Sequence, residues 1–265
     1  MIFAVTEPYF LAVTYILAGL LGLCVGSFLN VVIYRVPLGM SLASPPSHCP
    51  QCDNRIRWYD NIPVISYCIL RGKCRVCKQH IPLRYTIVEA SHMLLWLLCA
   101  ALFHNNVLYM CVAMIVCSVC MCVFFIDLEH LIIPDRFQII LAVCGVCFVF
   151  LDTGYGWVSH LIGFGAAAAV FLLVGYAVSR FKKREALGGG DVKLAACAGL
   201  LLGWEKFVLM MLIASFSASI FFMFKMRKDN ISNESPFGPF LTSGLVFAML
   251  FGNAVIDWYI SLLAV

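Results

Sequence analysis

Two acidic residues stand where an apolar chain has little reason to place them. Asp191 follows three glycines, Gly188–Gly190, and opens the apolar run "DVKLAACAGLLLGW". Asp127 follows another apolar run, in "FFIDLEHLIIPD". Burying a lone carboxylate in lipid is costly, so an acid inside a membrane segment indicates a functional site.

The chemistry open to these two acids is the hydrolysis of a peptide bond. Carboxylates that meet can share one proton, so that one is a base that activates water and the other an acid that protonates the leaving group. We expect Asp191, at a helix N-terminus, to ionise more readily and Asp127 to hold the proton. Gly188–Gly190 allow a substrate backbone to approach without a Cβ in the way.

Simpler interpretations of the same residues stay open. Asp191 could be an ordinary charge at a helix N-terminus, paired with Lys193 or with a basic loop. The acids of the earlier segment, Asp127, Glu129 and Asp135, could mark the end of a helix at the membrane interface. Glu129 and Lys193 could also tune the acid pair or hold the substrate backbone.

The elements that must position these acids are membrane helices. The chain has 265 residues, of which 63% are hydrophobic and 12% charged, and a mean hydropathy of +0.95. This composition excludes a soluble globular domain. Apolar stretches predict an all-α, polytopic bundle of about eight transmembrane helices, two of them short for the bilayer. The stretches lie near 8–34, 86–103, 107–126, 137–151, 157–179, 192–203, 207–224 and 240–263, of which 137–151 and 192–203 are the short ones.

Lysine and arginine predict the orientation of this bundle. They gather in the loop 37–83 and after the third, fifth and seventh stretches, whereas residues 104–107 and 152–157 have none. By the positive-inside rule the basic loops are cytoplasmic and both termini face outward. We interpret the basic loops as a topology signal in contact with anionic lipid, and expect no nucleic-acid partner. Asp127 and Asp191 then lie in the same layer, near the cytoplasmic face.

Four of the 14 cysteines differ from the rest. Cys49 and Cys52, then Cys74 and Cys77, form two C-x2-C pairs in the polar loop. Two such pairs predict four thiolates around a structural Zn²⁺. A reducing cytoplasmic loop argues against two disulfides, and His48 and His80 are alternative ligands. We therefore predict a first segment 1–36, a zinc-binding cytoplasmic loop 37–83 and a membrane core 84–265.

Five segments, in order, resemble the prepilin peptidase family, the type 4 leader peptidases with a G-x-G-D motif. They are "GSFLNVVIYRVP" (Gly26–Pro37), the four-cysteine loop through "IPLRYTIVE", "IDLEHLIIPD", "GGGDVKL" and "PFGPFL" (Pro236–Leu241). The resemblance implies that Asp127 and Asp191, rather than Asp135, are the catalytic acids. It also implies zinc at Cys49, Cys52, Cys74 and Cys77.

The resemblance implies a substrate and a second activity as well. Members cleave the basic leader of type 4 prepilins and of type 2 secretion pseudopilins after a glycine, on the cytoplasmic side of the bacterial inner membrane. Many then methylate the new N-terminus with S-adenosylmethionine, which is attributed to the N-terminal part with the large loop. The residues that bind this cofactor and the oligomeric state are not indicated by the sequence.

Three alternatives have their own expectations. A peptidase of the same type without methyltransferase activity is the nearest, and the four-cysteine loop argues against it on family grounds. An ion-coupled transporter would place its acids near the middle of the bilayer in related halves, and no repeat is visible. A membrane scaffold with a zinc lobe for docking would not need the two acids.

Overall fold

The structure is a computed structural model that describes residues 7–151, 156–182, 188–226 and 235–263. In these residues the chain is helical apart from turns and two isolated β-bridges, and it divides into two compact units, Met1–Met110 and Cys111–Val265. The prediction of an all-α membrane protein is confirmed. The predicted division at residues 36 and 83 stays a prediction.

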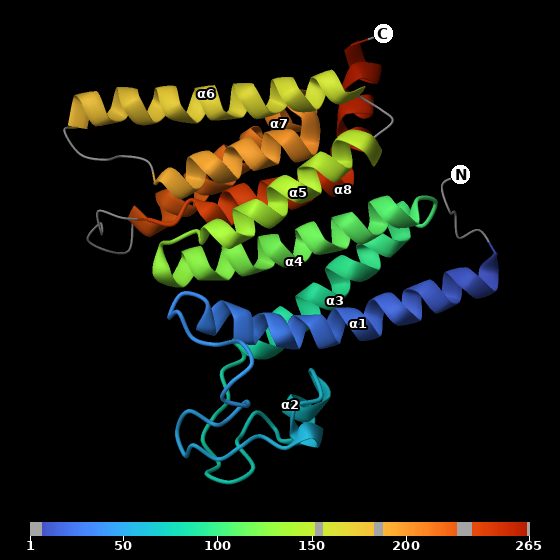
Figure 1. Cartoon of the computed structure of the whole chain (residues 1–265), viewed down its shortest axis with the longest axis vertical. Helices are drawn as coiled ribbons and strands as arrows, with labels where there is room; N and C mark the ends of the chain where they lie inside the picture. Colours follow the sequence, from blue (N-terminus) through green and yellow to red (C-terminus); the bar gives the residue numbers. More distant parts are fainter. Residues whose placement is uncertain (1–6, 152–155, 183–187, 227–234, 264–265) are drawn as a thin grey trace. The chain divides into compact units, whose positions relative to one another are not determined.

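The first unit is a helix pair with a loop lobe (Figure 1). Helix α1 (Pro8–Arg35) begins with proline in its first turn, where no backbone donor is lost. It packs against α3 (Arg84–Phe103) through Gly22 and Gly26, where a Cβ would lie 3.0 Å from the α3 backbone. The lobe between them holds the short helices η1 (Trp58–Asp60) and α2 (Ile65–Ile69).

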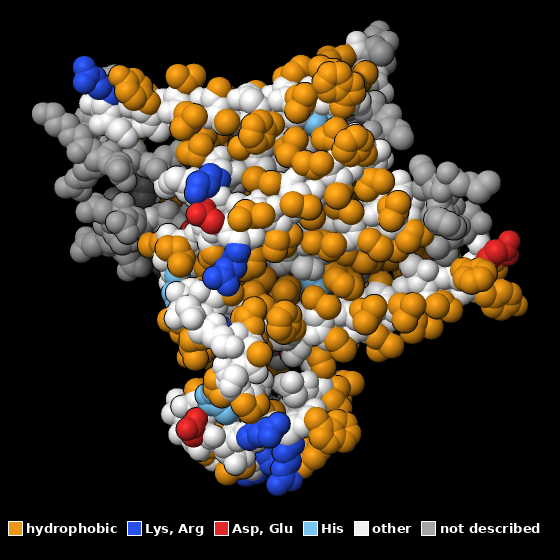
Figure 2. All heavy atoms as spheres, viewed as in Figure 1, with side chains coloured by type: hydrophobic (Ala, Val, Ile, Leu, Met, Phe, Trp, Pro, Cys, Tyr) orange, Lys and Arg blue, Asp and Glu red, His pale blue; other side chains and the backbone are white. Residues whose placement is uncertain are grey.

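The second unit is built from α4 (Val107–His130) from Cys111 on, α5 (Asp135–Leu151), α6 (Gly156–Lys182), α7 (Gly189–Met226) and α8 (Gly238–Leu263). Leucine, phenylalanine and other large apolar side chains are exposed along these helices, as Figure 2 shows. Lipid makes such exposure favourable, and a helix satisfies its backbone hydrogen bonds internally. Six helices of the described residues are long and apolar enough to cross a membrane, namely α1, α3, α4, α6, α7 and α8.

Helix α7 contains two of the predicted segments. It breaks at Gly203, whose φ of 74° and ψ of 168° suit glycine and almost no other residue. The predicted segments near 192–203 and 207–224 are the two legs of this one element. The eight predicted segments therefore all have helical counterparts, and α5, with 17 residues, is as short as predicted.

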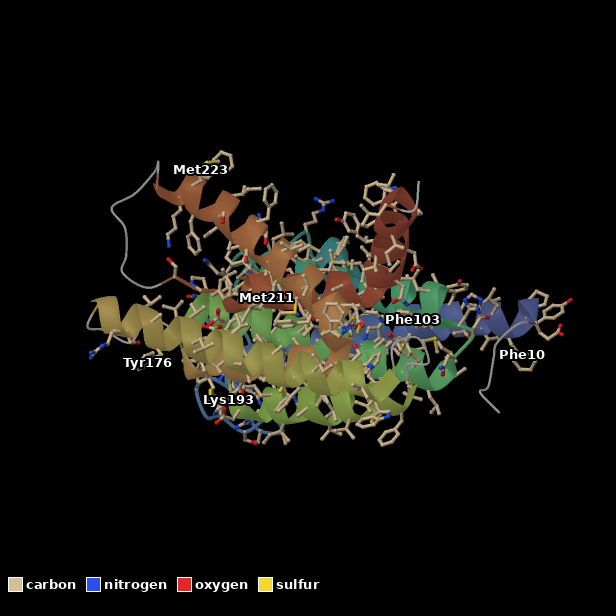
Figure 3. The ribbon with its side chains drawn as sticks, turned by 90° about the horizontal axis from the view of Figure 1, so that it is seen from above. Phe10, Phe103, Tyr176, Lys193, Met211 and Met223 are labelled. Carbon is tan, nitrogen blue, oxygen red and sulfur yellow. The ribbon has the colours of Figure 1, made fainter. Side chains whose placement is uncertain are left out.

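The two legs run in opposite directions. Gly190 at the start of α7 lies beside Ile133, and Phe221 near its end contacts Phe240 of α8. Gly252, far along α8, lies instead beside Lys206, just after the break. Both ends of α7 consequently lie at the same end of the unit, and Figures 1 and 3 show them on the same side of the view.

Helix α6 stabilises the turn between the legs. The Ser159 hydroxyl accepts a hydrogen bond from the Trp204 backbone N–H at 3.2 Å and donates to Glu205, so the second leg is capped from α6. One turn before the break, α6 and α7 cross at Gly163 and Gly199. The contact is so close that a Cβ on Gly199 would lie 2.2 Å from the Gly163 carbonyl oxygen. Such contacts between small residues let membrane helices approach each other.

Candidate functional site

Asp127 lies buried near the end of α4, with 5% of its surface exposed. Its Oδ2 atom accepts a hydrogen bond of 2.9 Å from the backbone N–H of Gly238, the first residue of α8. The first N–H groups of a helix have no partner within it and carry a partial positive charge. The start of α8 therefore orients the Asp127 carboxylate.

Asp191 lies in the first turn of α7, at the same end of the second unit. Its backbone N–H donates to the Gly188 carbonyl at 3.0 Å. Gly190, the residue before Asp191, packs against Ile133 just after α4, and Asp127 near the end of α4 contacts the start of α8. The two acids, 64 positions apart in the sequence as 191 minus 127 gives, therefore lie at the same end of the second unit. That they share a proton stays a prediction.

The glycines before Asp191 have different surroundings. A Cβ on Gly190 would lie 3.1 Å from Ile133, and the Gly190 carbonyl accepts a hydrogen bond of 3.2 Å from the buried Gln138 side chain of α5. A Cβ on Gly189 would meet nothing within 4 Å among the described residues. Packing therefore requires a glycine at position 190, whereas the space beside Gly189 has room for a substrate strand. The role of Gly188–Gly190 near the substrate stays a prediction.

The neighbouring charged residues form a separate pair. Lys193 donates a hydrogen bond of 2.7 Å to Asp135, and their side chains are 58% and 68% exposed. An exposed pair of this kind contributes little to stability. It ties Asp135 to Lys193 rather than to Asp127, which agrees with the choice of Asp127 as the first acid. Glu129 is exposed at the end of α4.

Two contacts of this site were not predicted from the sequence, the Gly238 hydrogen bond and the Gln138 anchor. A glutamine inside an apolar stretch is a signal that could have marked Gln138, because a buried amide needs partners. The Gly238 contact comes from a backbone N–H group, which every residue except proline has, so the residue type does not predict it.

The candidate metal centre lies in the lobe of the first unit. The Sγ atoms of Cys49, Cys52, Cys74 and Cys77 all lie within 4.8 Å of one another. The Cys49 and Cys77 sulfurs are 3.8 Å apart, which equals the separation of about 3.8 Å expected for two thiolates on one tetrahedral Zn²⁺. The predicted ligands are therefore in place for zinc, and His48 and His80 lie outside the cluster.

The two C-x2-C turns have the same local structure. In each, the first cysteine accepts a backbone hydrogen bond from the residue after the second, from Asp53 to Cys49 at 2.9 Å and from Lys78 to Cys74 at 3.1 Å. Asp53 and Lys78 have positive φ values of 58° and 61°. Because both turns curl in the same way, each presents two sulfurs to a common centre.

Two thiols of the cluster differ in their acidity. Hydrogen bonds from the backbone N–H groups of Cys77 and Val76 lower the pKa of Cys74 to about 7. The Gln79 backbone hydrogen bond lowers the pKa of Cys77, but burial and the Cys74, Cys52 and Cys49 thiols together raise it to about 11. Beside the cluster, Arg75 makes a two-pronged contact with Asp60, at 2.6 Å for the closest atoms, and this hydrogen bonding lowers the pKa of Asp60. The pair joins the second cysteine turn to η1.

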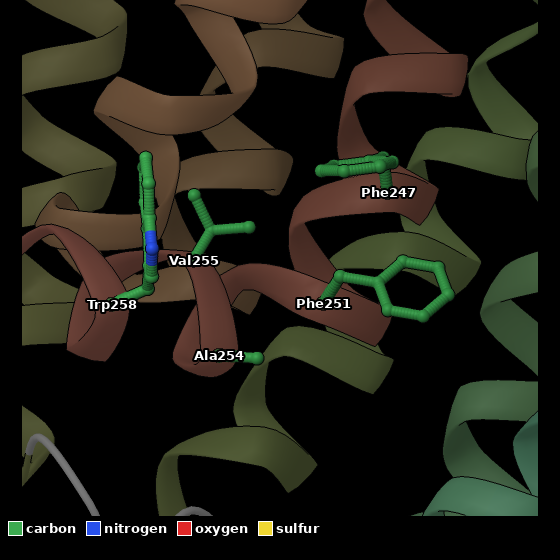
Figure 4. Close-up of a pocket in the computed structure, with 5 residues that line it drawn as sticks. All are labelled: Phe247, Phe251, Ala254, Val255 and Trp258. Carbon is green, nitrogen blue, oxygen red and sulfur yellow. The ribbon is translucent and has the colours of Figure 1, made fainter.

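An apolar groove lies on α8, lined by Phe247, Phe251, Ala254, Val255 and Trp258 (Figure 4). All five side chains come from one helix and offer no charged group. A surface of this kind suits lipid, and we assign it no part in the chemistry.

Comparison with known proteins gives two family matches. The family described as Bacterial Peptidase A24 N-terminal domain matches residues 20–103. The family described as Type IV leader peptidase family matches residues 114–223, which include both acids. No solved structure matches the chain.

Several curated relatives share most of this chain. "Prepilin leader peptidase/N-methyltransferase" of Pectobacterium carotovorum subsp. carotovorum is 33% identical over 88% of this chain and 91% of its own length. The protein of the same name from Legionella pneumophila is 30% identical over 97% and 96%. That of Myxococcus xanthus is 36% identical over 76% of this chain, which spans 59% of that relative's length.

Proposed function

We propose, because this chain belongs to the type IV leader peptidase family, that it cleaves the leader from prepilins and then N-methylates the new N-terminus. The observation that supports the cleavage is the position of Asp127 and Asp191 at the same end of the second unit. The methyl transfer is supported by the relatives' names, which carry both activities. A peptidase without methyl transfer and a transporter are accordingly not favoured.

The proposed cleavage is direct attack by water. The ionised Asp191 takes a proton from water, and the oxygen attacks the carbonyl carbon of the scissile peptide bond. Asp127 gives its proton to the leaving nitrogen as the C–N bond breaks. We assign the shared proton to Asp127 because it is the more buried acid, although the pair titrates as a unit. Asp127 and Asp191 are proposed as the catalytic residues.

The proposed substrate would present its scissile bond near the membrane face at which the two acids are predicted to lie. A prepilin is itself part membrane helix, and type 2 secretion pseudopilins share this plan. The peptide bond after the leader glycine must be unwound to be cut. The room around Gly189 supports the approach of an extended strand at this point.

The function is tested by incubating the purified chain with a prepilin, with and without S-adenosylmethionine, and measuring intact masses. We expect loss of the leader in both samples and the gain of a methyl group only with the cofactor. Leader loss without any methyl gain would leave a peptidase alone. An unchanged prepilin would contradict the proposal altogether.

The proposed structural cofactor is Zn²⁺ at Cys49, Cys52, Cys74 and Cys77. A metal supplies folding energy to a lobe that buries few apolar side chains of its own. We expect one zinc per chain in a reduced preparation, lost in Cys49→Ser or Cys74→Ser and kept in Cys68→Ser, whose exposed thiol lies in the same lobe outside the cluster. Elemental analysis measures it, and a metal-free, folded wild type would contradict it.

We also propose the bacterial inner membrane as the location, with the lobe and the acids facing the cytoplasm. Residues 152–155 of the predicted outer loop lie outside the described residues, so Trp157, exposed at the start of α6, is the better probe. In a background that keeps the four cysteines of the cluster and lacks the other native reactive cysteines, an impermeant thiol reagent should label Trp157→Cys in intact cells and leave Lys73→Cys unlabelled. Labelling of Lys73→Cys in intact cells would mean that the protein has the opposite orientation in the membrane.

A further inference from the structure

Gln138 of α5 is a buried polar residue that has no part in the proposed cleavage so far. Its side chain is 4% exposed, and its Nε2 group donates hydrogen bonds to the Gly190 carbonyl at 3.2 Å and to the Ile133 carbonyl at 3.4 Å. Because both partners are acceptors, the NH₂ group of the amide must face them, which fixes the orientation of the side chain. One side chain of α5 therefore joins the segment before α5 to the start of α7.

These two carbonyls belong to the segments that follow one acid and precede the other. Ile133 lies in the short connection between α4, which carries Asp127 near its end, and α5. Gly190 directly precedes Asp191. The hydrogen bonds of Gln138 therefore act on the placement of both segments, although Gln138 makes no described hydrogen bond to either carboxylate.

The peptide group next to Asp191 is held at both of its ends. Its oxygen is the Gly190 carbonyl, which accepts from Gln138. Its N–H is that of Asp191, which donates to the Gly188 carbonyl at 3.0 Å. A peptide group is planar and nearly rigid, so holding both ends fixes the backbone from which the Asp191 side chain extends.

Further contacts keep α5 in register with the first leg of α7, which lies beside it in Figure 1. The Cys197 thiol donates to the Gln138 backbone carbonyl at 3.4 Å. A Cβ on Gly145 of α5 would lie 2.9 Å from Leu200 of α7. Because close contacts of this kind leave little freedom to slide, the Gln138 amide meets the Gly190 carbonyl at one defined place.

The other half of the amide argues against a role in packing alone. The Oε1 atom of Gln138 is buried and accepts no hydrogen bond in the described part of the chain. A buried acceptor without a partner is costly, whereas a methionine would fill a similar space without this cost. The benefit of a glutamine at this position is therefore the pair of hydrogen bonds that its NH₂ group donates.

We propose that Gln138 is a positioning residue for Asp191, because its amide holds the start of α7 at a fixed place relative to the segment that follows Asp127. The proposal rests on the proposed cleavage by Asp127 and Asp191. That mechanism needs the two carboxyl groups at one defined separation, since one takes a proton from water while the other gives a proton to the leaving nitrogen. Gln138 serves this need without contacting the substrate.

The first test is Gln138→Met, which keeps the length of the side chain and removes the donor. Displacing a catalytic group by about 1 Å costs about 10²-fold in rate, so we expect kcat for leader cleavage to fall at least about tenfold. KM should stay near the wild-type value, because the lost contact is not with the substrate. Initial rates over a range of prepilin concentrations give both constants, and thermal unfolding of the same purified full chain gives its stability.

Ser159→Ala is the matched control. Ser159 is also buried, and its hydroxyl also makes a hydrogen bond from a neighbouring helix to the backbone of α7, but at the break, to the Trp204 N–H at 3.2 Å. Both variants should lower the unfolding temperature, since each loses a buried hydrogen bond. Only Gln138→Met should lose kcat. An equal loss of kcat in Ser159→Ala would mean that any loosening of α7 impairs cleavage, which would contradict a specific role for Gln138.

Gln138→Glu provides a second test if Gln138→Met does not fold. While protonated, the new carboxyl group can donate to the Gly190 carbonyl, but once ionised it can only accept and directs a negative charge at carbonyl oxygens. We expect kcat of this variant, divided by that of the wild type, to fall as the pH rises from about 5 to about 9, the range in which even a buried glutamate ionises. The same ratio for Gln138→Met should not depend on pH.

Two results would overturn the proposal while leaving the proposed function intact. One is an unchanged kcat in folded Gln138→Met, and the other is a ratio for Gln138→Glu that stays constant over this range of pH. A wild type that leaves the prepilin uncut would instead contradict the proposed function itself.

Discussion

Replacing either Asp127 or Asp191 with asparagine should reduce leader cleavage by about 10³-fold or more, because base and acid act as one unit and neither works alone. Asparagine has nearly the same shape and keeps the acceptor for the Gly238 N–H at 2.9 Å. The variants should therefore stay folded, retain zinc and still methylate a substrate that has already been cleaved. Leader removal from a prepilin by each purified variant, measured beside methylation, gives both readouts.

Asp135→Asn is the matched control for this experiment. It removes an acid from the neighbouring segment, but Asp135 is paired with the exposed Lys193 and does not contact Asp127 through any described hydrogen bond. Most of the cleavage activity should remain. Normal cleavage by Asp191→Asn would refute the mechanism, and loss with Asp135→Asn but not with Asp127→Asn would move the first member of the pair.

The features that could be predicted from the sequence are those with local signals. Apolar stretches mark helices because lipid leaves the backbone no partner outside the segment. The C-x2-C pairs mark the metal centre because each turn is built within a few residues, as the matching hydrogen bonds at Cys49 and Cys74 show. The position of Asp127 and Asp191 at the same end of the second unit could be predicted from topology, since two segments that end or begin at one membrane face must share a layer.

Contacts made by backbone groups of distant segments could not be predicted in this way. The sequence predicts the break at Gly203 only as a boundary between two segments, near 192–203 and 207–224, and its stabilisation by Ser159 of α6 depends on how α6 and α7 cross. Ser159 and Gly203 belong to no pattern of sequence spacing, because residues that meet through helix packing are not constrained to any fixed separation in the chain.

Gly238 should be as sensitive as the acids although it has no side chain. A Cβ at this position would lie 2.8 Å from Oδ2 and 3.0 Å from Cγ of Asp127, closer than two such groups can approach. Gly238→Ala must push the carboxylate away from the α8 N-terminus or tilt the helix. Displacing a catalytic group by about 1 Å costs about 10²-fold in rate, so we expect at least that loss in leader cleavage.

The kinetic form of the loss separates positioning from unfolding. In our proposal Gly238 contacts Asp127 and not the substrate. We therefore expect kcat to fall while KM stays near the wild-type value. Gly165→Ala is the matched control, because a Cβ on Gly165 of α6 meets nothing within 4 Å among the described residues, and alanine favours a helix. It should cleave as the wild type does. A Gly238→Ala enzyme with unchanged kcat would mean that the α8 N-terminus does not hold the acid during the reaction.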